Sequence, residues 1–261
     1  MKILQVNSFY PLWSTGKITH DLHTMLQKEQ HQSIVCYGRG PNIEEDGIYQ
    51  ICTERLSRLN RAWIRISGIM YGGHYLSTTK LIQIIKKEKP DIVHLQCINS
   101  SFVNIYRLIT YLKNHQIKTI LTLHAEFMYT ANCGYAFDCN KWKTGCGHCP
   151  RLKQETRSLL FDATAYSWWR MKRAFNGFKE NLVIASVSPW LMQRAKLSPI
   201  LADKKHVVVL NGLDTEVFHH YSSNHIRAEL GIGNDEKVIF HATPNFTDNP
   251  KHIKGGRFVI E

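Results

Sequence analysis

Long apolar runs and acidic residues are both scarce in this sequence of 261 residues. No apolar run approaches the roughly 18 to 20 residues that a membrane-spanning helix requires, and residues 1–7 lack the pattern of a signal peptide. Lys and Arg total 33 against 21 Asp and Glu, which gives a formal net charge of +12. We therefore expect a cytosolic protein. Its basic surface either keeps helix faces solvated or attracts an anionic membrane or a phosphate-bearing substrate.

Common nucleotide-binding and hydrolase motifs are also missing. The sequence contains no G-x-G-x-x-G, no G-x4-G-K-[ST], no G-x-S-x-G and no H-E-x-x-H. The sequence therefore gives no support for four classes of protein: dinucleotide-binding proteins, P-loop proteins, hydrolases with a nucleophile elbow, and zincin metalloproteases. No acidic pair indicates a glycosidase, and no nucleic-acid motif accompanies the positive charge. Internal repeats and low-complexity segments are absent from the sequence as well.

Apolar strands alternate with segments of helical spacing along most of the chain. This order predicts an α/β protein with a mostly parallel, doubly wound sheet. A boundary falls near residues 211–214, and residues 237–241 are expected to start a fresh strand in a second domain. The strands expected before the boundary are 3–6, 33–37, 91–95, 117–123, 182–187 and 206–210, and the helices are 17–30, 58–70, 74–87, 102–114, 155–178 and 189–196.

Four of the seven cysteines crowd into one polar stretch that follows the strand at 117–123. Their spacing is C-x5-C-x6-C-x2-C, and the last pair has a good chelating geometry. Tetrahedral zinc is the simplest site for four thiolates. Unliganded thiols are the second interpretation, and disulfide or redox pairing, disfavoured in the cytosol, is the third. His148 is expected to face solvent. The candidate ligands are Cys133, Cys139, Cys146 and Cys149.

Two further positions lie where open α/β folds place ligands, beyond the carboxyl ends of strands. His124 ends the strand at 117–123 and either hydrogen-bonds a ligand or is satisfied by nearby backbone. Gly16 lies in the loop between the first strand and the first helix, where backbone N–H groups can face a phosphate. Gly16 alone is weak evidence, because the loop carries no dinucleotide fingerprint.

Tryptophans and the remaining cysteines are assigned mainly to packing. Trp168 and Trp169 share helical spacing with apolar neighbours, so a core or membrane-facing role is favoured over a stacking platform. The other cysteines lie scattered among expected strands and loops, and they are predicted to pack in the core. These cysteines are Cys36, Cys52 and Cys97.

Several phrases, taken in their order and spacing, resemble the family 4 glycosyltransferases. The resemblance covers nearly the whole chain. The cysteine segment, from Cys139 to Pro150, is similar to a subgroup that acts in exopolysaccharide, colanic-acid-like and lipopolysaccharide O-chain synthesis. One departure is Ala125, where that subgroup commonly carries an acid. The other matching phrases are the strand 1–7 with Gly16, Lys89-Pro90-Asp91-Ile92-Val93-His94, Thr122-Leu123-His124, Ser186-Val187-Ser188, and Asn211-Gly212-Leu213-Asp214 with Phe218.

The resemblance implies a GT-B fold with two Rossmann-like domains. It also implies a transferase that moves a sugar from a nucleotide-sugar to a lipid-linked or glycan acceptor with retention of configuration. By analogy, Gly16 approaches the donor diphosphate, His124 bonds the transferred sugar, and Lys254 neutralises the leaving phosphate. No catalytic metal is implied, so zinc at the cysteines would be structural. The expected partners are donor, acceptor and anionic membrane surface, without nucleic acid, and the expected location is cytoplasmic or peripheral on the inner face of the membrane.

The expected organisation has a complete first domain and a second domain only begun. Residues 1–210 form an acceptor-side Rossmann-like domain with a four-cysteine insert at 125–150, and residues 211–224 form a linker. Residues 225–261 start a truncated nucleotide-sugar domain. Two other functions remain open. The first is a catalytically inactive glycan- or membrane-binding protein on the same half-fold, and the second is a basic, zinc-containing nucleic-acid binder.

Overall fold

The computed structural model describes residues 1–261 except residues 100, 223, 234, 244–245, 248–255 and 261. The chain divides into two compact units, Met1–Gly212 and Leu213–Glu261. The division lies close to the boundary expected near residues 211–214. The assignment of the second unit to a nucleotide-sugar domain stays a prediction.

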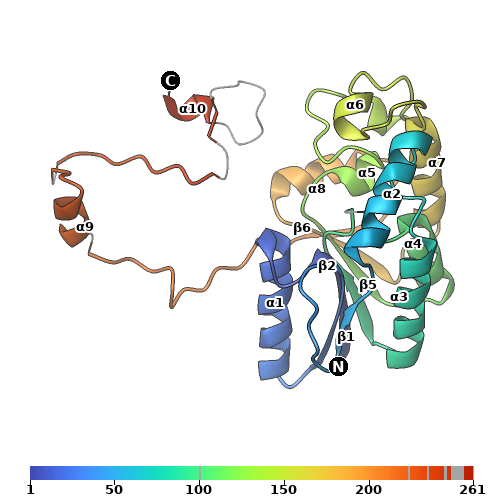
Figure 1. Cartoon of the computed structure of the whole chain (residues 1–261), viewed down its shortest axis with the longest axis horizontal. Coiled ribbons are helices and arrows are strands. Elements are labelled where there is room, and N and C mark those ends of the chain that lie inside the picture. Colours follow the sequence, from blue (N-terminus) through green and yellow to red (C-terminus); the bar gives the residue numbers. More distant parts are fainter. Residues whose placement is uncertain (100, 223, 234, 244–245, 248–255, 261) are drawn as a thin grey trace. The chain divides into compact units, whose positions relative to one another are not determined.

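A single parallel sheet forms the centre of the first unit (Figure 1). Its seven strands run in the order β3-β2-β1-β4-β5-β6-β7. The chain therefore winds outwards from β1 in both directions, which confirms the doubly wound α/β fold. The strands are β1 (Lys2–Phe9), β2 (Gln32–Arg39), β3 (Ile48–Gln50), β4 (Ile92–Leu95), β5 (Thr119–Leu123), β6 (Leu182–Ser186) and β7 (Lys205–Val208).

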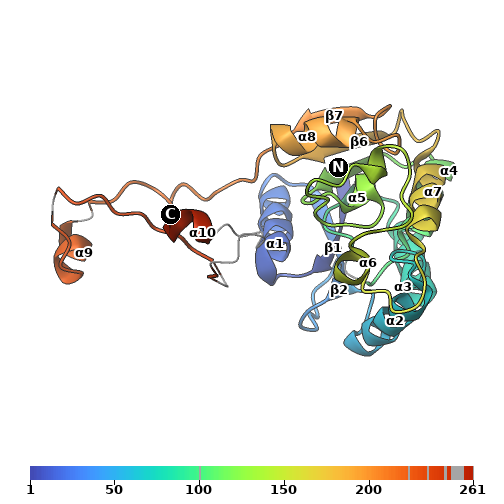
Figure 2. The same ribbon diagram turned by 90° about the horizontal axis from the view of Figure 1, so that it is seen from above.

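Helices cover both faces of this sheet, with α1 on one face and α3, α4 and α7 on the other (Figures 1 and 2). Strands buried on both faces need nearly continuous apolar sequence, and Leu4, Val93 and Leu121 are fully buried in neighbouring strands. The helices of the first unit are α1 (Trp13–Lys28), α2 (Glu54–Ser67), α3 (Tyr75–Glu88), α4 (Ile105–Asn114), α5 (Phe127–Thr130), α6 (Leu152–Glu155), α7 (Thr164–Phe175) and α8 (Pro189–Lys196), with a 3₁₀ turn at Lys141–Lys143.

Side-chain caps fix where three of these helices begin. The side-chain oxygens of Thr53, Asn104 and Ser188 accept hydrogen bonds from the backbone N–H groups of Leu56, Arg107 and Leu191. Asn104 and Ser188 follow the carboxyl ends of β4 and β6. Helices α4 and α8 therefore start at the edge of the sheet where α5 and α6 also lie (Figures 1 and 2).

The long helix expected at residues 155–178 is wrong. The chain instead forms α6 and α7 with an irregular connection between them. The carboxylate of Asp162 accepts hydrogen bonds from the backbone N–H groups of Thr164 and Cys149 at 2.9 and 2.6 Å. Such local bonds compete with helix formation. Arg157 has a φ of 57°, and the N–H of Leu159 donates to the carbonyl oxygen of Arg65 in α2. The interruption brings residues 159–161 beside α2.

The second unit contains two short helices, α9 (Asn224–Glu229) and α10 (Arg257–Ile260). The strand expected at 237–241 is wrong, because these residues have no regular secondary structure. A strand needs a hydrogen-bonding neighbour to form, and the described residues of this unit supply none. Across the described part of the chain, no helix combines the length and apolar character that crossing a membrane requires.

Candidate active site

The loops that follow β1 and β4 are joined by hydrogen bonds at the carboxyl edge of the sheet. The N–H of Ser8 donates to the carbonyl oxygen of Cys97 at 2.9 Å, and the N–H of Cys97 donates to Oδ1 of Asn7 at 3.0 Å. Asn7 also donates through Nδ2 to the carbonyl oxygen of Phe9 at 2.8 Å. These bonds fix the two loops at the edge of the sheet where open α/β proteins bind ligands.

His124 lies at this edge, directly after β5. Its Nε2 is 3.0 Å from Oε1 of Gln96, which follows β4. An amide oxygen only accepts, so this contact assigns the ring proton to Nε2 and leaves the Nδ1 lone pair free. Burial lowers the pKa of His124, so the ring is neutral at pH 7. A neutral imidazole with a free lone pair can accept a hydrogen bond from a sugar hydroxyl.

Two buried polar atoms beside His124 have no hydrogen-bond partner among the described residues. They are Nε2 of Gln96 and Oγ of Ser186. Ser186 ends β6 and is the register partner of Leu123, the residue before His124. Buried polar groups are normally hydrogen-bonded. These two atoms therefore mark a place where a ligand or water would gain partners.

Gly16 occupies the first turn of α1, whose N-terminus reaches the same edge. A Cβ atom at this position would lie 3.1 Å from the carbonyl oxygen of Phe9 and 3.2 Å from the carbonyl carbon of Pro11. Glycine thus lets the helix pack closely on the loop after β1. The first N–H groups of a helix lack intrahelical partners and suit an anion. Contact of Gly16 with a donor diphosphate stays a prediction.

The cysteine segment folds around Trp142, which is 1% exposed. Nε1 of Trp142 donates to the carbonyl oxygen of Cys139, and Nε1 of Trp168 donates to the carbonyl oxygen of Trp142, both at 2.8 Å. Nζ of Lys141 donates to the carbonyl oxygens of Gly147 and His148 at 3.0 and 2.7 Å. The segment is therefore an ordered loop anchored on α7.

The four cysteines of this loop line one small cavity of about 20 Å³. Burial is the largest cause that raises the pKa of the Cys133, Cys146 and Cys149 thiols, and the neighbouring cysteines add to it. The value for Cys146 is raised to about 12. Among the described residues, all cysteines are free and no group of His, Cys, Asp or Glu is arranged to hold a metal ion.

Glu126 was not predicted as a functional residue, yet it connects the loop to the site. Its carboxylate is 3% exposed and accepts from Nε of Arg194 at 2.6 Å, from the hydroxyl of Tyr129 at 2.5 Å and from the N–H of Ala136 at 2.5 Å. The guanidinium of Arg194 also lies over the ring of Trp142. The acid that the resemblance implies at position 125 is absent, because Ala125 stands there, but Glu126 is one residue later. That neighbouring acid is the signal that could have found it.

The other predicted positions are located as follows. Cys36 and Cys52 are buried in the core as expected, whereas Cys97 is only partly buried and its Sγ is 3.0 Å from Oδ1 of Asn99. Trp168 is buried and Trp169 is exposed. His148 is exposed, as expected. Lys254, the predicted partner of the leaving phosphate, lies outside the described residues.

A family model and one curated relative agree with the predicted family. The model of the family described as Glycosyltransferase Family 4 matches residues 15–217. The chain is 26% identical over 164 residues to the putative colanic acid biosynthesis glycosyl transferase WcaC of Escherichia coli. That match covers 58% of this chain and 40% of the relative, so the chain spans about two fifths of the relative's length. A UDP-GlcNAc 2-epimerase from Methanocaldococcus jannaschii matches 80% of this chain and 45% of its own, with 11% identity and a TM-score of 0.39.

Removal of the Glu126 charge tests its role in holding the loop. We expect Glu126→Gln to lower the free energy of unfolding by roughly 3 kcal/mol, because Arg194 then keeps its charge without a buried partner. Urea denaturation at pH 7 measures this change. Asp21→Asn is the control, since its contacts with Lys17 and His20 are exposed and their loss should cost less than about 1 kcal/mol. If both variants change the free energy of unfolding by the same small amount, Glu126 does not hold the loop.

Proposed function

Because this chain belongs to glycosyltransferase family 4, we propose that it is the acceptor-side part of an enzyme that moves a sugar from a nucleotide-sugar to a lipid-linked or glycan acceptor. The process would be synthesis of a bacterial surface polysaccharide, either exopolysaccharide or lipopolysaccharide. The family match over residues 15–217 carries this proposal. The relative named for colanic acid biosynthesis supports the choice of process.

The geometry of the carboxyl edge supports a role in sugar binding. His124 is held by Gln96 and is neutral at pH 7, so it would bond a hydroxyl of the transferred sugar through Nδ1. The N-terminus of α1 lies on the same edge and would face the donor diphosphate. In this proposal Gly16 lets the first turn of α1 approach the donor diphosphate, and the role of Lys254 is to neutralise the leaving phosphate.

An exposed apolar surface on α2 supports a lipid-linked acceptor. Leu59, Trp63 and Ile66 follow one another at helical spacing and are all exposed, Leu59 by 69% and Ile66 by 56%. We call these three residues the α2 apolar face. The arginines of α2 flank it, and the exposed side chains of residues 159–161 extend it, because the N–H of Leu159 is bonded to Arg65. An apolar stripe bordered by arginines is typical of a helix that lies in an anionic membrane surface.

Structural zinc at the four cysteines is part of the proposal. The thiols share one cavity, and four thiolates suit tetrahedral zinc. As they stand the side chains are not arranged for coordination, so binding would require them to turn towards the cavity and release their protons. Cys133, Cys139, Cys146 and Cys149 would hold the ion, which would stiffen the loop next to His124 and take no part in the transfer.

A protein that binds glycan or membrane without transferring sugar is the second candidate function. The exposed α2 apolar face favours it, because this surface needs no donor to act. The two candidates differ in one measurable property, the dependence of the product on a nucleotide-sugar.

Sugar transfer is tested with membranes from cells that express the protein and a panel of radiolabelled nucleotide-sugars. We expect label to enter the glycolipid fraction, and His124→Ala to lower the rate roughly 100-fold, a size typical of losing one bond in a preorganised site. Because burial lowers the pKa of His124, the rate should begin to fall at a lower pH than it would with an unshifted imidazole. His31→Ala, before β2 at the opposite edge, is the control. Donor-independent binding without label would favour the second candidate.

Zinc binding is tested by the metal content of protein purified from zinc-supplemented medium. We expect about one zinc per chain, lost in Cys146→Ser together with a lower melting temperature, because coordination contributes folding free energy. Cys97→Ser, outside the loop, should keep the metal. Metal-free wild-type protein that melts like Cys146→Ser would show that the cluster consists of free thiols.

Membrane attachment is tested by sedimentation with phosphatidylglycerol vesicles. Leu59→Gln with Ile66→Gln should weaken partitioning at least about tenfold, because two inserted apolar side chains are lost. Both side chains are exposed, so the fold should be unaffected. The matched control is Met25→Gln with Leu197→Gln, two exposed apolar residues on α1 and after α8. If both pairs behave alike, α2 is not the membrane contact.

A further inference from the structure

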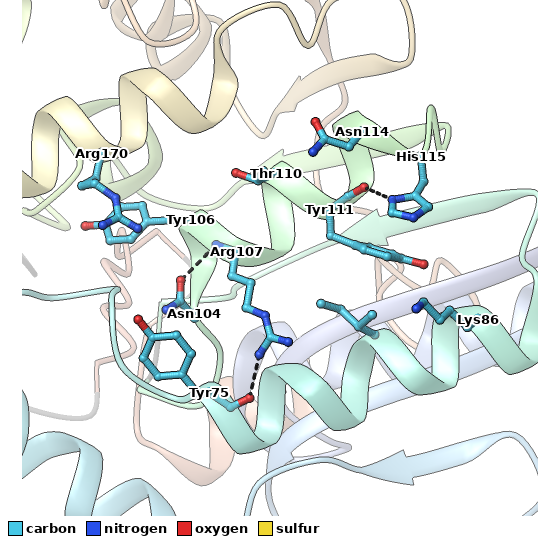
Figure 3. Close-up of a pocket in the computed structure, with 11 residues that line it drawn as sticks. Tyr75, Lys86, Asn104, Tyr106, Arg107, Thr110, Tyr111, Asn114, His115 and Arg170 are labelled. Carbon is cyan, nitrogen blue, oxygen red and sulfur yellow. Dashed lines mark hydrogen bonds between the residues drawn. The ribbon is translucent and has the colours of Figure 1, made fainter.

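A groove between α3 and α4, with the side of α7 at one end, is not used by the proposed transfer. It has a volume of about 530 Å³, within the range of ligand pockets. It lies on the outer surface of the helices that cover one face of the sheet (Figure 3). We call it the α3–α4 groove. The side chains that matter for the argument are those of Tyr75, Lys86, Tyr106, Arg107, Tyr111 and Arg170.

Positive charge in this groove is not neutralised by the protein. No Asp or Glu is among the residues that line it. In the described part of the chain, no carboxylate forms an ion pair with Lys86, Arg107 or Arg170, although eleven other ion pairs occur. The unpaired cations favour an anionic ligand.

Neutral contacts hold the cationic side chains in place. Nη1 of Arg107 donates to Oγ1 of Thr79 at 2.7 Å and to the carbonyl oxygen of Tyr75 at 3.1 Å, which leaves the rest of the guanidinium facing the groove (Figure 3). The guanidinium of Arg170 lies 5.2 Å from the ring centre of Tyr106. An arginine ordered in this way is prepared to bind a carboxylate or phosphate in a bidentate manner.

Tyrosine rings are the second component of the groove. Tyr75 is 61% exposed, and Tyr111 lies beside Lys86, whose Nζ is 6.0 Å from the centre of that ring. Each ring offers an apolar face with a polar hydroxyl at its end. Such faces suit sugar rings, which present C–H groups between their hydroxyls. The groove thus differs from the α2 apolar face, where exposed Leu and Ile favour lipid.

We infer that the α3–α4 groove binds an anionic glycan, a sugar chain that carries carboxylate groups. Arg107, Lys86 and Arg170 pair with the carboxylates, while Tyr75 and Tyr111 contact the sugar rings. The inference goes beyond the proposed transfer. It requires neither donor nor turnover, so its failure would leave the proposed transfer untouched.

Binding is measured by titration of the purified chain with oligogalacturonate as the probe. We expect saturable binding that Arg107→Gln with Lys86→Gln weakens at least about tenfold, since each removes a charge-assisted contact. Lys28→Gln with Lys205→Gln removes the same charge on α1 and β7 and should change the affinity by less than about twofold. Lys86→Gln alone, at an exposed position, serves if the double variant does not fold. Absent binding, or equal effects of the two pairs, would overturn the inference.

Two further measurements separate a glycan from other anions. Tyr75→Ala should weaken oligogalacturonate binding about fivefold through lost ring contact and leave the binding of inorganic polyphosphate unchanged. If Tyr75→Ala binds oligogalacturonate as tightly as the wild type, the groove does not recognise sugar rings and the inference of a glycan ligand is overturned. If oligothymidylate binds as tightly and is lost in the same double variant, the groove is a nucleic-acid site. If the double variant instead loses the binding of phosphatidylglycerol vesicles, the groove is a membrane site.

Discussion

The buried carboxylate of Glu126 is the contact on which the arrangement around the candidate site depends. It joins the segment after β5, the cysteine loop and α8, since it accepts bonds from Tyr129, Ala136 and Arg194. A buried charge is tolerated only when it is paired and hydrogen-bonded. Each of these elements must therefore stay in place for the others to be stable. His124 lies two residues earlier, so the same contact helps to fix the position of its ring beside Gln96.

The distribution of charge is more informative than its sum. A net charge of +12 fits several anionic partners. The structure separates the basic residues into different settings. On α2 the arginines flank exposed apolar side chains, which favours a membrane surface. In the α3–α4 groove the cations alternate with tyrosines around a concave space, which favours a hydrated anionic ligand.

The sheet and the position of the site could be predicted from the sequence because they follow from local patterns. The apolar runs of β1, β4 and β5 indicate buried parallel strands, and the carboxyl ends of such strands meet at one edge. The gathering of Cys133, Cys139, Cys146 and Cys149 also follows, because only fifteen residues lie between the first and the last in one loop. Gly16 is expected in the loop before the first helix but lies in the first turn of α1, and its close packing on Phe9 depends on the tertiary structure.

Features that depend on contacts between distant segments could not be predicted in this way. The helical spacing of residues 155–178 is genuine, but Asp162 bonds to the backbone of Cys149 and Thr164 and interrupts the helix. Glu126 pairs with a residue 68 positions later, which no periodicity reveals. The α3–α4 groove arises only when Arg170 of α7 packs on Tyr106 of α4.

Trp142 gives the cysteine loop an internal support that does not involve the thiols. Its indole is buried, bonds within the loop and packs under Arg194, while Trp168 bonds to its carbonyl oxygen. Burial keeps the thiols of Cys133 and Cys146 protonated by raising their pKa. A metal ion would have to displace those protons, so part of the coordination free energy would be spent in doing so. Because Trp142 already holds the fold of the loop, the ion would mainly add rigidity to it. Metal binding would therefore leave His124 in place, because its hydrogen bond to Gln96 holds the ring whether the thiols are protonated or bound to the ion.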